Sequence, residues 1–431
     1  MAALTIFCSS LSVHCKPCRA TSAPQEKTRL CTLPRVPTTS STGSAASKRA
    51  GIARRNRSAP SMEAPSPDLK TSSICPEDPG LKNQVVGAAL HLKEHGWAIV
   101  DDVLTREECE EYVEAVWDWL EGLGTGISRS DPSTWTGPQW VQSFKGIINS
   151  LEVAHQDFVW RIRKHPRLVQ IFEMLWGTNE LLSSFDSINV TAPSKETGTP
   201  HDTTSWLHVD QAPLRRGFFC VQGIVNLVDV SGDTSGTLLV KDRTHSEHAH
   251  FFDTASSLSC EQQENLTHSP AGPKDFYVFK PEEVPYWERF QTLPLAAKAG
   301  SVFLWDSRTV HANKIPHFSE QWRHVVYACY QPRALATEKD LLAKRKAWDD
   351  YAVTTHWPAA NVSITSGLDY VGGAGGKAGG TPPYTLRRTR DAVDDRMLRQ
   401  LAGVEPYQAT DIRLQPALLG LSEEELRTML Q

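Results

Sequence analysis

The stretch Trp206-Leu207-His208-Val209-Asp210-Gln211 decides the fold assignment of this 431-residue sequence. It lies among short β-like runs, and on a strand residues two apart project from the same face. The imidazole of His208 and the carboxylate of Asp210 are therefore expected to reach one metal ion. These two groups supply two of the three ligands in the facial triad of non-haem iron sites.

The third ligand is expected on a later strand. The segment Gly300–His311 is typical of a glycine turn followed by a strand that delivers His311. Arg323 opens the next run, and we expect the loop between them to return the chain antiparallel, with Arg323 beside His311. Since a guanidinium matches a carboxylate bidentately, Arg323 is predicted to bind an acidic co-substrate. Arg333, at the far end of that run, is predicted not to bind it.

A second triplet, His155-Gln156-Asp157, has the same spacing. It stands at the start of a helical pattern, where residues two apart point about 200° away from each other. We therefore predict no metal site there. Because such triplets occur by chance, the metal assignment depends on the ordered set of His208, Asp210, His311 and Arg323.

The order of elements along the chain indicates the fold class. Two helical patterns separated by a short strand at Gly96–Val100 occupy 83–123, and a further one at 157–176 is interrupted at Pro166. Short β-like runs separated by turns follow after residue 180. This order favours a mainly β fold with flanking helices, as an antiparallel sandwich or jelly roll. The expected strands are Ser187–Thr191, Gly217–Val228, Thr237–Val240, Val302–Trp305 and His324–Tyr330.

The N-terminal segment, residues 1–66, is rich in Ser, Thr, Ala and Arg. Its composition is typical of an organellar transit peptide, with a disordered tail as the alternative. The Met-Ala-Ala opening and the many hydroxyl residues favour the chloroplast over the mitochondrion. We expect the folded domain at 75–370, and a Gly-rich linker with a helical tail at 371–431.

Charge and hydropathy limit the partners. Residues 1–62 hold ten of the 45 basic residues and one of the 50 acidic residues, which leaves a net charge of −14 afterwards. Such an acidic chain should repel nucleic acid. No apolar run approaches the roughly 20 residues that span a bilayer, so no membrane span is expected. Single, scattered cysteines indicate a reduced compartment, and Cys15–Cys18 lacks the second pair of a zinc site. A small-molecule substrate remains as the expected partner, and the sequence does not indicate an oligomeric state.

Four segments resemble the phytanoyl-CoA dioxygenase (PhyH)-like family. They are Glu94–Thr105, the block around His208 and Asp210, Gly236–His245, and Gly300–Asn313. The resemblance covers about residues 80–335. It implies a cupin-like double-stranded β-helix with Fe(II) held by His208, Asp210 and His311, with 2-oxoglutarate and O2 as co-substrates and ascorbate as a stimulant.

The resemblance also implies a reaction. It is hydroxylation or desaturation of a small organic or lipid-like substrate, with release of succinate and CO2. Two positions depart from the family pattern: its usual Gly-Ser-His reads Arg243-Thr244-His245, and a lysine expected near the cofactor is Thr191. A CoA ester is therefore not implied as the substrate.

Further pocket residues are predicted around this centre. Gln222, Thr191 and Asn189 are assigned to the co-substrate, with a structural role as the alternative. Trp206 and Trp305 are assigned to the substrate pocket, with core packing as the alternative.

Two other functions stay open. One is a zinc hydrolase that uses His245, His248 and His250, and the other is a catalytically inactive β-helix binding protein.

Overall fold

The computed structural model describes residues 78–268, 275–365 and 384–430. The expected transit peptide at 1–66 and the Gly-rich segment 372–380 lie outside the described residues. Among the helices of the described ranges, none has both the length and the apolar character needed to cross a bilayer.

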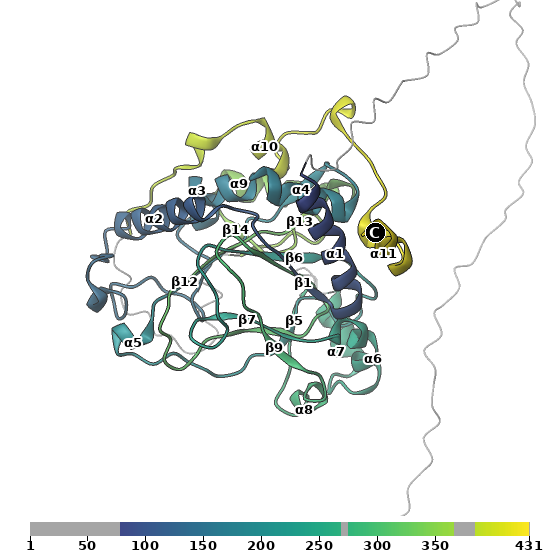
Figure 1. Cartoon of the computed structure of the whole chain (residues 1–431), viewed down its shortest axis with the longest axis horizontal. Coiled ribbons are helices and arrows are strands. Elements are labelled where there is room, and N and C mark those ends of the chain that lie inside the picture. Colours follow the sequence, from purple (N-terminus) through teal and green to yellow (C-terminus); the bar gives the residue numbers. More distant parts are fainter. Residues whose placement is uncertain (1–77, 269–274, 366–383, 431) are drawn as a thin grey trace, which may run out of the picture. The chain divides into compact units, whose positions relative to one another are not determined.

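Two antiparallel sheets form the centre of the fold (Figure 1). Strands β4, β5, β6 and β7 alternate between the two sheets, and so do β10, β11 and β12. This alternation is that of a jelly roll, in which the chain passes back and forth between two facing sheets. The prediction of a mainly β, cupin-like fold with flanking helices is confirmed. The six-stranded sheet has the order β1 (Trp97–Val100), β10 (Val302–Asp306), β6 (Val221–Asn226), β12 (Arg323–Tyr327), β4 (Ile188–Thr191), β2 (Ile147–Ile148), and the five-stranded sheet β8 (Tyr277–Val278), β5 (His208–Val209), β11 (His311–Lys314), β7 (Thr237–Lys241), β9 (Thr292–Pro294).

The central strands are covered on both faces. Every residue of β6 is buried, although successive side chains of a strand point to opposite faces. Ile224 packs between the sheets with Val325 and Leu238, whereas Val225 and Val326 belong to the core beneath the helices. The interior of the jelly roll is therefore a compartment distinct from the larger helix-side core.

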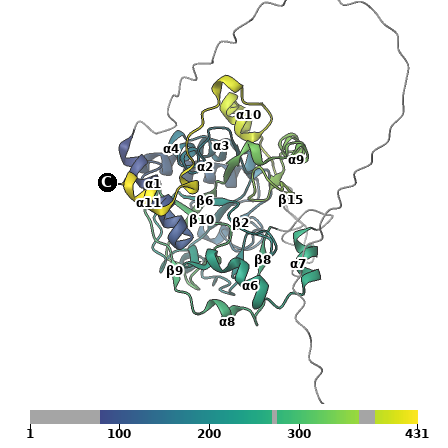
Figure 2. The same cartoon turned by 90° about the vertical axis from the view of Figure 1, so that its right-hand side faces the viewer.

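A layer of helices covers the outer face of the six-stranded sheet (Figures 1 and 2). Helix α2 starts at a capping box, in which the Thr105 hydroxyl accepts from the Glu108 amide and the Glu108 carboxylate accepts from the Thr105 amide. Pro166 opens a new helix, as its position in the pattern predicted. The layer consists of α1 (Pro79–His95), α2 (Arg106–Gly122), α3 (Asp157–Arg163), α4 (Pro166–Trp176) and α9 (Glu338–Asp349).

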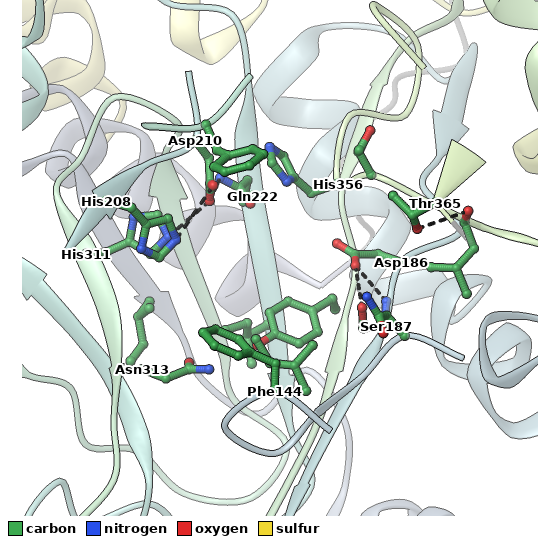
Figure 3. Close-up of a pocket in the computed structure, with 18 of the residues that line it drawn as sticks. Phe144, Asp186, Ser187, His208, Asp210, Gln222, His311, Asn313, His356 and Thr365 are labelled. Carbon is green, nitrogen blue, oxygen red and sulfur yellow. Dashed lines mark hydrogen bonds and ion pairs between the residues drawn. The ribbon is translucent and has the colours of Figure 1, made fainter. Parts of the chain in front are cut away.

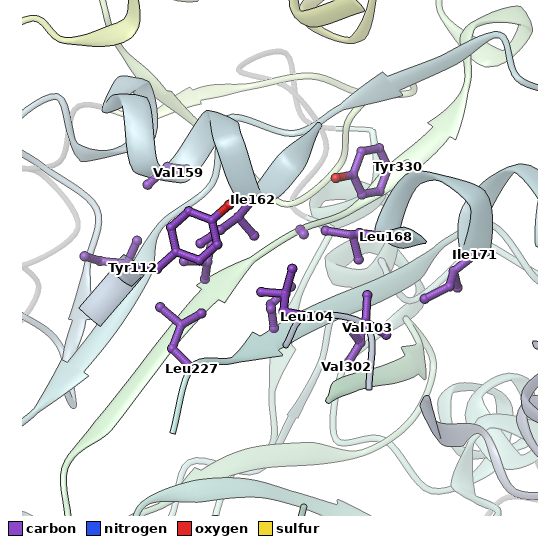
Figure 4. Packing of buried hydrophobic residues seen from close by; sticks show 14 of the residues in the cluster. Val103, Leu104, Tyr112, Val159, Ile162, Leu168, Ile171, Leu227, Val302 and Tyr330 are labelled. Carbon is purple, nitrogen blue, oxygen red and sulfur yellow. The ribbon is translucent and has the colours of Figure 1, made fainter. Parts of the chain in front are cut away.

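Figure 4 shows the helix-side core, in which Tyr112, Ile162 and Leu168 from the helices meet Val302 of β10 and Leu227, which directly follows β6. Burying aliphatic and aromatic side chains of this size stabilises the fold by about 1.5–3 kcal/mol each. The C-terminal segment joins the same core through Leu398 of α10 (Arg396–Ala402), Leu418, and Leu426 of α11 (Glu423–Met429).

Smaller elements complete the described chain. A second apolar cluster lies beneath the five-stranded sheet, where Phe251 and Trp287 come from α6 (His248–Thr254) and α8 (Val284–Trp287). Two small sheets pair β3 (Leu181–Ser183) with β13 (Tyr330–Pro332) and β14 (Val353–Thr354) with β15 (Ile364–Thr365). The other helices of the described residues are α5 (Ser194–Thr197), α7 (Cys260–Thr267) and the 3-10 helices η1 (Pro132–Thr134), η2 (Val153–His155), η3 (Thr244–Glu247), η4 (Arg333–Leu335), η6 (Arg390–Val393), η7 (Ala409–Asp411) and η8 (Leu418–Gly420).

The strands after Gly300 differ from expectation. His311 begins β11 rather than ending the preceding strand, because β10 stops at Asp306. Strand β11 pairs with β5 and β7, whereas β12 pairs with β4 and β6. The predicted antiparallel pairing of the two strands that carry His311 and Arg323 is therefore wrong. The physical reason is that a jelly roll sends these consecutive strands to opposite sheets, which face each other across the interior.

Candidate metal centre and active site

His208, Asp210 and His311 meet at the junction of β5 and β11 (Figure 3). His311 lies directly opposite His208 in the sheet, and the two ring centroids are 4.1 Å apart. The Asp210 carboxylate is 3.7 Å from His208 Nε2 and 3.1 Å from His311 Nε2. Within the described part of the chain, this is the one group of three His, Cys, Asp or Glu side chains whose ligand atoms all lie within 4.8 Å of one another.

Backbone carbonyls orient both imidazoles. Nδ1 of His208 lies 3.0 Å from the Trp206 carbonyl, and Nδ1 of His311 lies 2.9 Å from the Thr309 carbonyl. Because a carbonyl only accepts, each Nδ1 carries the proton and donates it. Each Nε2 is then left with a lone pair beside Asp210, which is how metal-binding histidines are usually held.

Two side chains hold Asp210 in place. The Gln222 amide donates to Asp210 Oδ2 at 2.9 Å, and the Trp357 indole donates to the Asp210 carbonyl at 3.2 Å. Gln222 was predicted to contact the co-substrate, but its amide nitrogen has the Asp210 carboxylate as its partner. Gln222 also lines the neighbouring cavity.

The protonation states of His208 and Asp210 suit a metal. Burial, with a further contribution from His311, lowers the pKa of His208 to about 3, so its ring is neutral. Burial acts to raise the pKa of Asp210, but His356, His208 and His311 beside it outweigh burial and hold that pKa below its usual range. Neutral imidazole and ionised carboxylate are the metal-binding forms. Two imidazole nitrogens and one carboxylate are the donor set that fits Fe(II).

The three residues lie in the wall of a cavity of about 290 Å³. Trp206 and Trp305, both predicted pocket residues, line it. Trp206 stacks on His208 with ring centroids 4.2 Å apart, and Trp305 lies 5.4 Å from His311. Phe144 packs edge-on against Trp206 at 4.9 Å, so aromatic rings flank the candidate metal centre.

Arg323 is buried in the interior without a partner. The residue is 2% exposed, and its Nε and Nη1 form no hydrogen bond in the described structure. Burial lowers the pKa of Arg323. A Cβ at Gly236 would lie 2.9 Å from the Arg323 Cδ, so glycine leaves room for this side chain. A buried guanidinium that no described residue pairs with is costly, and it indicates an anionic partner beyond the described residues.

Arg333 lies in a different environment. It belongs to η4 beyond β13, and its guanidinium is 3.5 Å from the Glu180 carboxylate. Arg323 stands on the same face of β12 as Tyr327, which lines the cavity. The two arginines thus lie in different surroundings, Arg323 on the face of β12 that packs into the jelly-roll interior and Arg333 beside Glu180.

Asn189 and Thr191 lie next to Arg323, because Thr191 is its direct partner across β4 and β12. Their polar atoms are used locally: the Thr191 hydroxyl donates to Asn189 Oδ1 at 2.8 Å, and Asn189 Nδ2 donates to the Lys145 carbonyl at 3.0 Å. Neither residue is among those that line the cavity.

The other candidate histidines make structural contacts. His155 Nε2 lies 2.9 Å from the Ala352 carbonyl, and Asp157 accepts from the Thr389 hydroxyl. The zinc-hydrolase alternative has no ligand group in the described ranges. His245 Nε2 is 3.0 Å from the Lys93 carbonyl, His248 Nε2 is 3.4 Å from the Gln211 carbonyl, and His250 is exposed. His248 and His250 diverge because they are two apart on helix α6.

Several residues of the site were not predicted. Asp186 precedes β4, and His356 and Trp357 follow β14, yet Asp186 and His356 line the cavity and Trp357 contacts Asp210. No local sequence signal marks them, since only the tertiary fold brings the β14–β15 hairpin to the interior.

The chain is similar to several known proteins. Among solved structures, GlcNAc Inducible Gene 2 from Candida albicans is 14% identical, with 79% of this chain and 80% of that chain covered and a TM-score of 0.47. EctD from S. alaskensis, solved with 2-oxoglutarate and 5-hydroxyectoine, is 15% identical, with 63% of this chain and 83% of that chain covered and a TM-score of 0.38. Ava biosynthesis cluster protein O of Aspergillus versicolor is 32% identical over 265 residues, which are 61% of this chain and 83% of that protein. Residues 92–325 match the phytanoyl-CoA dioxygenase (PhyH) family. The chain therefore belongs to the phytanoyl-CoA dioxygenase family and is a 2-oxoglutarate-dependent dioxygenase, a non-haem iron oxidoreductase.

Proposed function

We propose that the protein hydroxylates or desaturates a small organic or lipid-like substrate, using Fe(II), 2-oxoglutarate and O2, and releases succinate and CO2. One observation carries the proposal. A buried ligand group of two histidines and an aspartate and a buried, unpartnered arginine occur in the interior of one jelly roll.

His208, His311 and Asp210 would hold the iron through Nε2, Nε2 and a carboxylate oxygen. Gln222 and Trp357 keep Asp210 in position through hydrogen bonds to its carboxylate and carbonyl. The Nδ1 contacts of the two histidines fix their tautomers before any ligand arrives. Such preorganisation means that little has to move when the metal binds.

Arg323 would bind the distal carboxylate of 2-oxoglutarate. Its fork of N–H donors matches a carboxylate bidentately, and burial removes competition from water. Asn189 and Thr191, hydrogen-bonded to each other beside Arg323, support that end of the co-substrate site.

When bound, iron with 2-oxoglutarate and O2 supplies the oxidising power: one oxygen atom enters succinate as CO2 leaves, and the other oxidises a C–H bond of the substrate. The protein's own contribution is to exclude water and to hold that bond in place. Trp206, Trp305 and Phe144 provide an apolar wall for this purpose.

The proposal is tested by incubating purified protein with Fe(II), 2-oxoglutarate and O2. Slow succinate formation without a primary substrate is expected, because these enzymes turn over part of the co-substrate uncoupled. Absence of iron-dependent succinate under all conditions would favour a catalytically inactive binding protein. Profiling a plant or algal extract with active enzyme, for a gain of about 16 mass units from one inserted oxygen, would identify the substrate.

We further propose the chloroplast as the compartment, on the composition of residues 1–66. Fusion of residues 1–62 to a fluorescent reporter should carry it into plastids. Import into mitochondria would change the assigned compartment, and a reporter that stays in the cytosol would contradict both the chloroplast and the mitochondrial assignment.

A further inference from the structure

A second polar group lies in the cavity wall away from the ligand group. It is formed by the loop before β4 and by the β14–β15 hairpin, neither of which holds a candidate metal ligand. Figure 3 shows Asp186, Ser187 and Thr365 across the cavity from His208 and His311, with His356 between the two sides. We call Asp186, Thr355 and His356 the distal polar site.

Several polar atoms of this wall already form hydrogen bonds within the protein. Asp186 Oδ1 accepts from the amide and the hydroxyl of Ser187 at 2.6 and 2.9 Å. The Thr365 hydroxyl donates to the Val353 carbonyl, and the Thr354 hydroxyl contacts the Phe185 amide and the Thr355 carbonyl. These groups therefore have partners within the protein.

Three atoms of the distal polar site have no hydrogen-bond partner among the described residues. Asp186 Oδ2 takes no hydrogen bond from any described residue, and no described cation lies within ion-pair distance of this carboxylate. His356 Nε2 and the Thr355 hydroxyl are buried without a partner. Buried polar groups are nearly always hydrogen-bonded in folded proteins. Asp186, Thr355 and His356 all line one cavity, and their polar atoms without a partner among the described residues therefore indicate a polar group on a ligand.

The backbone fixes Asp186 in this position. The buried Arg163 guanidinium donates to the carbonyls of Asp186, at 2.7 Å, and of Ala154, at 2.9 Å. Burial raises the pKa of Asp186, and His356 beside it acts in the opposite direction. A hydroxyl can both donate and accept, so it can pair with either form of this carboxyl group.

The wall between the two polar regions is apolar. It includes Phe144, Ile147, Trp206, Val278 and Val353. A ligand that reaches from the distal polar site to the metal group must therefore present an apolar body to these side chains.

We propose that the distal polar site binds a hydroxyl group of the primary substrate, whose apolar, ring-sized body packs against the Phe144–Trp206 pair. This inference rests on the proposed function, because it treats the cavity as the substrate site. Asp186 Oδ2 and His356 Nε2 exchange hydrogen bonds with the hydroxyl, and the opposite side of the molecule faces His208 and His311. The substrate class is an apolar alcohol.

Matched probes test this assignment. Menthol, menthone and menthylamine share one skeleton, as do cyclododecanol, cyclododecanone and cyclododecylamine. Their affinities for the full chain are measured by calorimetry, under anaerobic conditions with Fe(II) and 2-oxoglutarate, and again without either. Because no turnover is read, the result is independent of succinate formation, and a failed oxygenase would be recognised separately.

The alcohol of at least one skeleton should bind about tenfold more tightly than its ketone and its amine, the difference expected for one satisfied polar pair. In Asp186→Asn, Ser187 keeps the amide oxygen at the Oδ1 position, so the –NH2 replaces the acceptor Oδ2. The ketone should then bind about tenfold more tightly than the alcohol. Asp306→Asn changes a buried carboxylate outside the cavity and should leave the wild-type order intact, once thermal unfolding confirms its fold.

Four results would overturn the proposal. They are equal affinity for alcohol and ketone, a preference for the amine, an alcohol preference that survives in Asp186→Asn, and no binding of any probe.

Discussion

The two His-X-Asp triplets of this chain have the same spacing and buried histidines, yet only one belongs to a ligand group. His208 and Asp210 stand at the end of β5, beside His311 on the neighbouring strand. His155 and Asp157 stand on either side of the junction between η2 and α3, where the first contacts the Ala352 carbonyl and the second the Thr389 hydroxyl. The difference teaches that a short spacing acquires chemical meaning from the secondary structure beneath it and from the third residue that a neighbouring strand supplies.

Substitution at the two triplets should give the largest difference. His208→Ala or Asp210→Ala should reduce iron-dependent decarboxylation of 2-oxoglutarate to background, because the two ligands that remain cannot hold the metal in the required form. Asp157→Ala should stay within about threefold of wild type, since a surface pair with Arg161 contributes little. Succinate release measures both.

His155→Ala needs a separate control. This side chain is fully buried and also contacts Arg390, so its removal should destabilise the fold by about 2–4 kcal/mol. Succinate release must therefore be measured at a temperature where the variant remains folded, as judged by circular dichroism. If the folded His155→Ala protein is inactive while Asp210→Ala is active, the assignment of the two triplets is reversed.

The two arginines provide the next comparison. Arg323→Leu should raise the KM for 2-oxoglutarate by about a hundredfold, the cost of a buried carboxylate that loses its charged partner. Arg323→Lys should also fail, because an ammonium lacks the bidentate fork. Arg333→Leu removes only the pair with Glu180, so its KM should stay within about threefold. The opposite ranking in a 2-oxoglutarate titration would refute the role of Arg323.

Substitution of Gln222 should have a smaller effect, which we expect in the affinity for Fe(II). In Gln222→Leu, Asp210 Oδ2 loses its amide donor, so Fe(II) affinity should fall about 10- to 100-fold, as is usual for groups that orient a ligand. The matched control is Gln263→Leu, a buried amide of α7 that donates to the Phe252 carbonyl. Anaerobic Fe(II) titration should leave the control unchanged, and equal losses in the two variants would indicate a general loss of stability.

The smallest effect concerns how stability depends on pH at the second triplet. Burial lowers the pKa of His155 from 6.5 to about 3 in the folded chain. As the pH falls below about 6.5, the unfolded chain takes up this proton first, so the free energy of unfolding falls by up to about 1.4 kcal/mol per pH unit. His155→Gln should therefore lose stability less steeply between pH 7 and pH 5.5 in urea unfolding. Parallel slopes would show that His155 is protonated in the folded state.

Much of the site could be predicted from the sequence, because metal ligands are recognisable by their residue types and spacing. His208, Asp210 and His311 were recognisable from a strand-like triplet and a later histidine, and the helix start around His155 excluded the competing triplet. The fold class followed from the change from helical to β-like patterns after residue 180. In each case the local pattern and the tertiary structure agree.

The rest depended on contacts between distant segments. The pairing of β11 with β12 was predicted wrongly, since strand order is set by how two sheets close on each other. The contact of Gln222 with Asp210 was not predicted, because the distance between these two side chains is set only in the folded chain. Asp186 and His356 were missed because the loop before β4 and the β14–β15 hairpin carry no motif. They are distinguished only by single atoms, Asp186 Oδ2 and His356 Nε2, that have no hydrogen-bond partner among the described residues.

The number of iron ions bound per chain shows most directly whether the metal binds at His208, Asp210 and His311. Anaerobic equilibrium dialysis with Fe(II) compares the wild-type chain with His208→Ala/Asp210→Ala and with Asp157→Ala, and it needs no substrate. A single iron ion per chain is expected for wild type and for Asp157→Ala, with loss of binding in the double variant. Iron that stays bound in the double variant, or that is lost in Asp157→Ala, would contradict the placement of the metal at His208, Asp210 and His311.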